Sequence, residues 1–215
     1  MTTPVQKTAY IGFGELGHQI SAFVAASGVR QEKFFFDDTC HAEALPNAFP
    51  LEKFASDRFA DLQFYVCLGY KHLAKKTEVI HRLLDLGRAL PSLVHPSCQV
   101  NPTASVGAGS VVYPMCNLDK EVTLGRGVLL NNSVVVSHNT SIGDGCYLAP
   151  GVVVSGFVHI GKSTFIGSGS VIANDLSIGD NVTIGLGTVV TRNVPDGASV
   201  IGNPMRVLKH PLRLS

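Results

Sequence analysis

SVVVSHNTSIGDGCYLAPGVVVSGFVHIGKSTFIG, residues 133–167, carries an aliphatic residue at every sixth position. The period continues without a gap in both directions along the chain. Its members are Val94, Val100, Val106, Val112, Leu118, Leu124, Leu130, Val136, Ile142, Leu148, Val154, Ile160, Ile166, Ile172, Ile178, Ile184 and Val190. A six-residue period is typical of a parallel β-helix, in which each repeat is one short strand and one tight corner. A β-sandwich has turns of irregular length, so the regular period argues strongly against one.

Three such repeats close one triangular coil, and coils stack about 4.8 Å apart. We expect each recurring aliphatic side chain to point into the coil. The residue beside it is often glycine, which lets the chain turn. The segment NVPDGASVIGNPM, residues 193–205, breaks the period and is expected to end the prism at its prolines.

The first 92 residues have a different rhythm, in which short apolar runs alternate with helical patterns. Residues 8–13, 33–38 and 64–70 are expected to be strands, and residues 18–27 and 71–87 helices. This alternation indicates a small parallel sheet of Rossmann type. We therefore expect two domains, a Rossmann-like α/β domain at 1–92 and a β-helix with a C-terminal tail at 93–215.

Gly12, Gly14 and Gly17 follow the first expected strand and spell G-x-G-x-x-G, the signature of a dinucleotide-binding turn. A complete dinucleotide fold has two mononucleotide halves, and the 92-residue region has room for about one. An NAD enzyme with a β-helix appendage is therefore disfavoured. We interpret the glycines as a turn where a phosphate approaches backbone N–H groups at a helix start.

Composition narrows the classes further. Hydrophobic residues make up 45% of the 215 residues, which is ample for a core, and a net charge of +1 gives no footprint for nucleic acid or an anionic membrane. The five cysteines have no C-x-x-C pair and are expected to be reduced core fillers. No histidines pair at metal-ligand spacing, so no metal is expected. Because no signal peptide or membrane-length apolar run is visible, we expect a cytoplasmic protein.

The repeats, closed by GASVIGNPMRVL at 197–208, resemble those of the hexapeptide-repeat acyltransferases. With the Rossmann-like region in front, residues 7 to 210 resemble the NeuD/PglD-type sugar O- and N-acyltransferases. The resemblance implies a left-handed β-helix, although parallel crossovers are usually right-handed. It also implies a homotrimer that binds acetyl-CoA in the groove between neighbouring prisms. A trimer would cover the apolar patch that Val and Ile form on a flat prism face.

His138 is the expected catalytic residue. It takes the third place of the repeat that begins at Val136, at an outward corner, and Gly156 lies one coil above it. In the family the equivalent histidine is the general base, and the surrounding Asn131, Ser133 and His138 match its pattern. Imidazole titrates near neutral pH, which suits proton removal from an attacking amine or hydroxyl. The alternative is an exposed surface histidine without a function.

The resemblance assigns roles to further residues. The Gly156 N–H would stabilise the oxyanion, and Asn131 would hold the incoming amine. Asn139 stands where the family often has a carboxylate, and would orient His138 through its amide oxygen. Tyr147 replaces a second family histidine that touches the acetyl group or CoA.

Positions further along the prism also correspond to CoA contacts in the family. Ser168 and Leu186 align with contacts one and two coils up. Arg192, Arg206 and Lys209 are available for the CoA phosphates, although solvated surface charge is the commoner role of such residues.

In the family the nucleotide sugar is bound by the glycine turn, an aspartate at the end of the second strand and the loop after the third. The corresponding residues are Gly12, Gly14, Gly17, His18, Asp37, Asp38, Gly69 and Tyr70. A structural turn without a ligand is the alternative for this segment.

The expected function is acetyl-CoA-dependent N-acetylation of a nucleotide-linked amino-deoxy sugar, such as a 4-amino-4,6-dideoxy sugar, for surface glycans. O-acetylation of a sialic acid or similar sugar is the alternative within the enzymes. A non-catalytic trimer that binds nucleotide sugars is the alternative outside them. The sequence leaves the nucleotide open.

Overall fold

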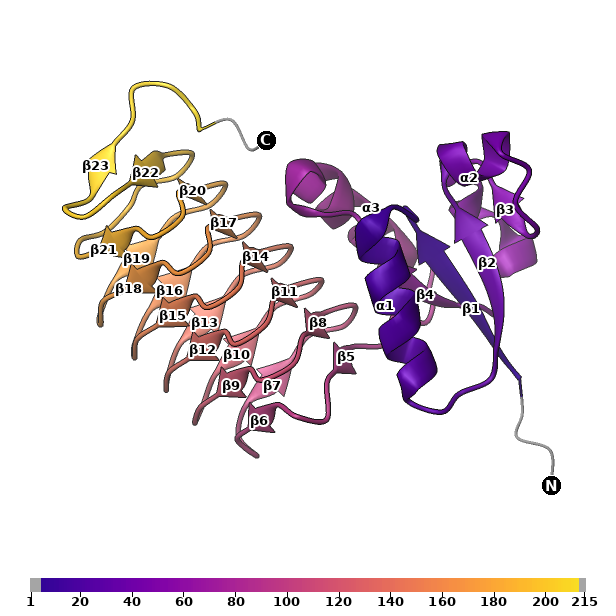
Figure 1. Ribbon diagram of the computed structural model, residues 1–215, viewed down its shortest axis with the longest axis horizontal. Coiled ribbons are helices and arrows are strands. Elements are labelled where there is room, and N and C mark those ends of the chain that lie inside the picture. The colour runs from indigo at the N-terminus through magenta and orange to yellow at the C-terminus, as the bar shows by residue number, and fades with distance from the viewer. Residues whose placement is uncertain (1–4, 213–215) are drawn as a thin grey trace. The chain divides into compact units, whose positions relative to one another are not determined.

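The computed structural model describes residues 5–212, in two compact units that divide between Pro91 and Ser92 (Figure 1). The outermost residues of the two expected domains, 1–4 and 213–215, lie outside the described residues. Each unit is described by itself below.

The N-terminal unit is a parallel four-stranded sheet with helices (Figure 1). The strand order is β3 (Ala48–Phe49), β2 (Gln31–Phe36), β1 (Gln6–Ile11), β4 (Gln63–Val66). The helices are α1 (Glu15–Ala26), α2 (Asp38–Ala42) and α3 (Leu73–Asp85), with 3-10 turns η1 (Leu51–Ala55), η2 (Asp57–Phe59) and η3 (Tyr70–His72). The expected strands and long helices are all present. The short α2 and β3 were not expected, because neither is long enough to show a period.

The β-helix unit is a three-sided stack of parallel strands. Face 1 contains β5 (Leu93–Val94), β8 (Val111–Val112), β11 (Leu129–Leu130), β14 (Tyr147–Leu148), β17 (Phe165–Ile166) and β20 (Thr183–Ile184), then β22 (Ser199–Ile201) and the antiparallel β23 (Arg206–Val207). Face 2 contains β6 (Gln99–Val100), β9 (Asn117–Leu118), β12 (Val135–Val136), β15 (Val153–Val154), β18 (Val171–Ile172) and β21 (Val189–Val190). Face 3 contains β7 (Ser105–Val106), β10 (Thr123–Leu124), β13 (Ser141–Ile142), β16 (His159–Ile160) and β19 (Ser177–Ile178).

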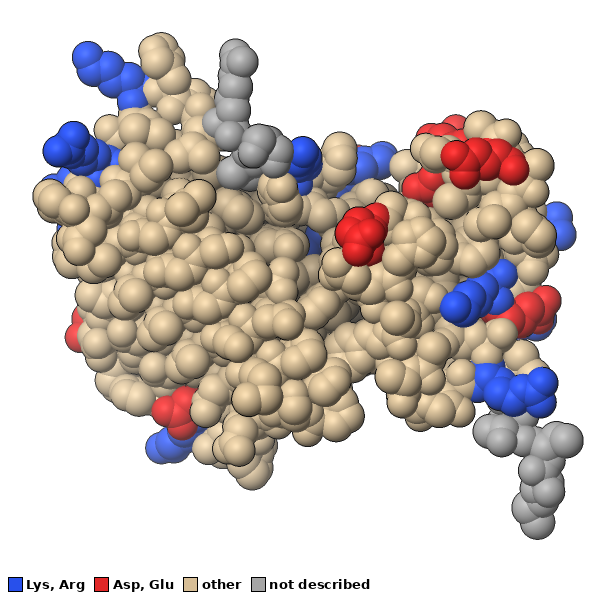
Figure 2. Space-filling view, in the orientation of Figure 1, with Lys and Arg blue, Asp and Glu red and all other residues tan. Residues whose placement is uncertain are grey.

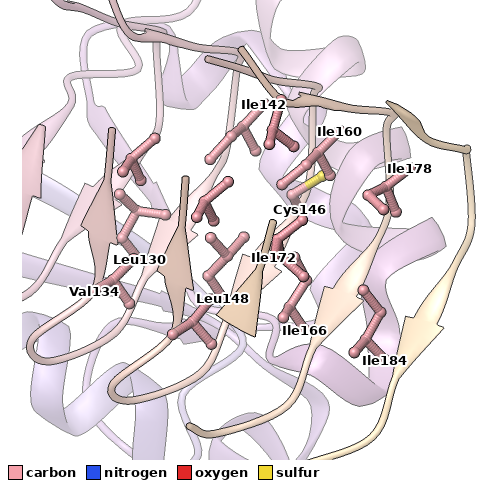
Figure 3. Close-up of a cluster of buried hydrophobic side chains, with 14 of the residues drawn as sticks. Leu130, Val134, Ile142, Cys146, Leu148, Ile160, Ile166, Ile172, Ile178 and Ile184 are labelled. Carbon is pink, nitrogen blue, oxygen red and sulfur yellow. The ribbon is translucent and has the colours of Figure 1, made fainter. Parts of the chain in front are cut away.

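The hexapeptide period sets this register. Each strand β5–β21 has two residues, and the second is the recurring aliphatic. Strands pair with those 18 residues away, as Leu124 does with Ile142. The aliphatic side chains meet inside the prism (Figure 3) and are buried from Val112 onward. The predicted β-helix is therefore confirmed, and its architecture matches the left-handed form.

Small polar residues join the coils at the corners. The buried Thr140 hydroxyl donates to the Ser155 carbonyl at 2.9 Å and accepts from the Val158 N–H at 3.2 Å. Thiols occupy equivalent places, because Cys116 and Cys146 donate to carbonyls one coil on. Burial raises the pKa of the Cys116 thiol to about 11, which keeps it protonated at neutral pH.

The surface is sparsely charged. Large areas of the view in Figure 2 carry no Lys, Arg, Asp or Glu, in line with the 15% of charged residues. Among residues 5–212 no helix is long and apolar enough to cross a membrane.

Candidate functional site

The corner between face 2 and face 3, called corner B here, holds His138. The residue follows β12, whose Val136 is fully buried and anchors the turn. Asn139 adopts φ 56°, a left-handed conformation that asparagine tolerates well, and its N–H donates to the Lys120 carbonyl one coil below. His138 is half-buried, so its ring is fixed at its base and reachable from solvent.

Within residues 5–212 the ring has a side-chain hydrogen-bond partner at Nδ1 and none at Nε2. Nδ1 of His138 lies 3.2 Å from Oδ1 of Asn139. Because an amide oxygen accepts and does not donate, Nδ1 carries the proton in this arrangement. Nε2 then keeps its lone pair, which is the state a general base requires.

Gly156 provides the space that the imidazole occupies. A Cβ at this position would lie 2.6 Å from Cε1 and 2.8 Å from Nε2 of His138. Among the described residues the Gly156 N–H has no hydrogen-bond partner, whereas its carbonyl accepts from Asp175. Next in the chain, Phe157 is 55% exposed and packs edge-on against His138, with ring centroids 5.0 Å apart. Phe157 was not anticipated from the sequence.

The corner between face 1 and face 2, called corner A here, gathers the other predicted residues of the prism. Asn131 follows β11, and its amide donates to the hydroxyl of Tyr147, one coil above, at 3.1 Å. Ser168 and Leu186 stack further along the same corner and are exposed, Leu186 by 76%. Within one chain the predicted residues of the prism are therefore divided. His138, Asn139 and Gly156 lie at corner B, whereas Asn131, Tyr147, Ser168 and Leu186 lie at or beside corner A.

Face 2 connects the two corners, and its outward side chains change from polar to apolar along the stack. Its outward residues are Gln99 and Asn117 in the first coils, then Val135, Val153, Val171 and Val189. At the polar end there is a hollow of about 350 Å³, lined by residues 99–101 and 117–119. Asp119 in this lining is 18 residues before Ser137, which places the hollow one coil below His138.

In the N-terminal unit the predicted residues meet at the carboxyl edge of the sheet. Gly12 has φ 76°, and a Cβ there would lie 2.8 Å from the Leu68 side chain. A Cβ on the buried Gly17 would lie 2.8 Å from the Gly12 carbonyl, so this glycine serves the packing of α1 on the turn. Gly14 precedes α1 and faces open space, because a Cβ there would have no atom within 4 Å, and the helix has no side-chain cap. Gly14 is where a ligand can approach the backbone.

The remaining predicted residues surround this turn. The Asp37 carboxylate accepts from the N–H groups of Phe13, Thr39 and Cys40, at 2.8, 3.0 and 3.0 Å. Asp38 accepts from Leu51 N–H. The exposed His18 packs against Phe13 with the two rings tilted by 51° and their centroids 4.5 Å apart. Gly69 and Tyr70 begin η3 after β4. The aspartates therefore also hold the turn and α2 in place.

Comparisons with known proteins found one family model and several solved structures that are similar to this chain. A family model described as the GMPPB C-terminal domain matches residues 90–192. The acetyltransferase domain of PglB from Neisseria gonorrhoeae is 29% identical, with a TM-score of 0.84 over 94% of this chain and 100% of that one. The structure of the same domain in complex with acetyl coenzyme A is 28% identical to this chain. Its TM-score is 0.81, over 95% of this chain and 100% of that one. Over nearly its whole length the chain is thus similar to an acetyltransferase domain that binds acetyl coenzyme A.

Another solved structure has the same fold. PerB from Caulobacter crescentus, in complex with CoA and GDP-perosamine, is 23% identical, with a TM-score of 0.86 over 97% of this chain and 100% of that one. Curated protein sequences gave no match.

The five cysteines of the chain are all free thiols. Burial raises the pKa of Cys67 well above its usual range, so this thiol stays protonated in the core. Within residues 5–212 no three His, Cys, Asp or Glu side chains gather as a metal site.

Asp37→Asn is expected to lower the stability of the N-terminal unit by about 1 kcal/mol at neutral pH, because the amide oxygen can keep the cap of α2 but the amide NH₂ cannot accept from the Phe13 N–H. Partial burial would raise the pKa of Asp37, but the N–H groups of Phe13, Cys40 and Thr39 outweigh it and leave the pKa below its ordinary value. The stabilisation is then present above about pH 4 and lost as the pH falls through the folded-state pKa.

Urea unfolding followed by helical circular dichroism measures this effect, because all the described helices lie in the N-terminal unit. The difference between wild type and variant should be full at neutral pH and vanish in acid. A difference that grows in acid would contradict the role given to Asp37.

Proposed function

We propose that the protein transfers an acetyl group from acetyl-CoA to the amine of a nucleotide-linked amino-deoxy sugar. The observation that carries the proposal is the His138 ring under Gly156, with Nδ1 held by Asn139 and Nε2 free. The acetyl-CoA complex of the PglB domain and the GDP-perosamine complex of PerB support the donor and the acceptor class. A 4-amino-4,6-dideoxy sugar destined for surface glycans is our specific proposal for the acceptor.

In the proposed reaction the amine nitrogen attacks the thioester carbon. Nε2 of His138 removes the amine proton as the carbon–nitrogen bond forms. The Gly156 N–H donates to the oxygen that becomes negative in the tetrahedral intermediate. The carbon–sulfur bond then breaks, and the imidazolium returns the proton to the leaving thiolate. No covalent enzyme intermediate is needed in this scheme.

We propose that each site is completed by a second copy of the chain, in a homotrimer. Face 2 lies between corner A and corner B, and its outward Val135, Val153, Val171 and Val189 form an apolar strip. Such a strip is stabilised when it packs against a neighbour. Packing face 2 against another prism would bring corner A of one copy to corner B of the next, which reunites Asn131 and Tyr147 with His138.

The two ends of face 2 suit different substrates. Ser168 and Leu186 lie on the C-terminal side of His138, where we place CoA. The hollow lined by Gln99, Asn101, Asn117 and Asp119 lies on the other side, and amides and a carboxylate suit sugar hydroxyls and an amine. We therefore propose that the acceptor sugar approaches His138 from the hollow. The use of acetyl-CoA supports a cytoplasmic location.

Release of free CoA thiol tests the donor and acceptor together. The protein is incubated with acetyl-CoA and with UDP-, GDP- and dTDP-linked amino sugars, alongside matched sugars that carry a hydroxyl at the amine position. We expect release with at least one amino sugar and none with its hydroxyl counterpart. Release with the hydroxyl sugar alone would instead identify O-acetylation.

Subunit mixing tests the shared site. His138→Ala and Asn131→Ala chains are each expected to be weakly active alone. Co-expressed in equal amounts, they should regain about a quarter of wild-type activity, since every mixed trimer then has one intact site of three. A mixture no more active than the separate variants would show that the residues act within one chain.

A further inference from the structure

Asn139 has a second polar partner one coil below. Its Nδ2 donates a hydrogen bond to Oε2 of Glu121. The other carboxylate oxygen, Oε1, lies 3.4 Å from the Lys120 ammonium. His138, Asn139 and Glu121 thus form a continuous chain of polar contacts along corner B, and the proposed reaction leaves Glu121 without a role.

The chemistry of the carboxylate fixes the direction of this chain. An ionised carboxylate only accepts hydrogen bonds, so the NH₂ group of the Asn139 amide must face Glu121. The amide oxygen then faces the imidazole and accepts from Nδ1–H. Without the carboxylate the amide is free to turn over, and an NH₂ group facing Nδ1 would favour the proton on Nε2.

We propose that Glu121 is a positioning residue that holds His138, through Asn139, in the tautomer with the proton on Nδ1. It would also place a negative charge near the imidazolium that forms during acetyl transfer. Asn139 and Glu121 together thereby replace a carboxylate in direct contact with the ring. The catalytic part of this inference rests on the proposed function, whereas the tautomer does not.

The backbone of this corner is held independently of the Glu121 side chain. The Glu121 N–H donates to the Thr103 hydroxyl at 2.8 Å, and the Asn139 N–H donates to the Lys120 carbonyl at 2.9 Å. The Glu121 side chain is half-exposed. Glu121→Gln should therefore fold as the wild type does.

Imidazole nitrogen NMR of the whole protein reads the tautomer directly. In the wild type at a pH where His138 is neutral, we expect Nδ1 to be protonated and Nε2 to be unprotonated. In Glu121→Gln we expect a substantial population with the proton on Nε2. Glu78→Gln, which removes an exposed carboxylate paired with Lys75, is the matched control and should leave the tautomer unchanged. An unchanged tautomer in Glu121→Gln would overturn the proposal, whatever the activity of the protein.

Kinetics in two backgrounds separates positioning from a merely structural role. With Asn139 present, Glu121→Gln is expected to lower kcat about ten-fold, with little change in KM for acetyl-CoA. This loss is smaller than the roughly 10⁴-fold loss of kcat that a wrong histidine tautomer causes in a buried Ser-His-Asp triad. In the Asn139→Asp background the new carboxylate accepts from Nδ1 by itself, so Glu121→Gln should cause no loss. An equal loss of kcat in both backgrounds would mean that Glu121 acts on the fold. No loss of kcat in either background would contradict the proposal that Glu121 positions His138 through Asn139.

Discussion

His138→Ala is expected to reduce kcat for acetyl transfer by about 10²–10⁴-fold, the usual contribution of a general base. The ring is half-buried under Gly156 and makes its only described side-chain hydrogen bond to Asn139, so its removal should leave the fold intact. The variant should have a near-wild-type melting temperature and should still bind acetyl-CoA, because the residues assigned to CoA stand at other positions.

His138→Gln is the companion variant, since it keeps a polar side chain of similar length that cannot act as a base at neutral pH. It should be as inactive as His138→Ala. A rate near that of the wild type in either variant would show that the base is elsewhere.

Gly156→Ala is expected to reduce kcat by about 10²-fold or more. The added methyl group would lie 2.6–3.1 Å from three atoms of the His138 ring, closer than real contacts allow. The ring is the part that can move, so the base would be displaced, and a misplacement of about 1 Å can cost about 10²-fold. The methyl group would also crowd the N–H that we assign to the oxyanion.

Gly143→Ala provides the contrast for this variant. A Cβ at Gly143 would meet backbone, 2.7 Å from Lys162 N, which cannot move aside as a ring can. Gly143→Ala should therefore lower the melting temperature and leave the activity of the folded protein unchanged. Gly156→Ala should instead lower kcat and leave the melting temperature close to that of the wild type. The double variant His138→Ala/Gly156→Ala tests whether the methyl group acts by displacing the ring. A kcat about 10²-fold below that of His138→Ala alone would contradict this explanation.

The β-helix could be predicted almost completely from sequence, because one physical requirement repeats. Each coil needs an aliphatic residue at the same place, and residues 18 apart must pair. The N-terminal unit was less regular. Its main strands and helices were visible as apolar periods, but α2 depends on a single side chain, the Asp37 carboxylate that caps it.

The site could be predicted in part. The spacing of 18 residues places Gly156 above His138, and the structure has the two in contact. The same spacing applied downward leads from Asn139 to Glu121, so the sequence contains this signal although Glu121 was not among the expected residues. Phe157 could not be found this way, because a bulky aromatic residue at a left-handed corner, φ 58°, follows no general rule.

The division between the corners could not be derived from a single repeat. It depends on which of the three faces each strand joins, and this is known only when the strands of a whole coil are assigned to faces. Asn131 and His138 are only seven residues apart in the sequence, yet β11 and β12, which precede them, belong to different faces. The proposed trimer follows from this division.

The most direct test of acetyl transfer to an amine is the identity of the bond that carries the acetyl group in the product. Acetyl-CoA with an isotopically labelled acetyl group is incubated with the protein and a nucleotide-linked amino sugar, and the purified product is analysed by NMR and mass spectrometry. The account predicts one labelled acetyl group, joined to the sugar nitrogen as an amide, and none when His138→Ala replaces the wild type. A label joined to oxygen as an ester, or released as acetate with the amine unmodified, would contradict it.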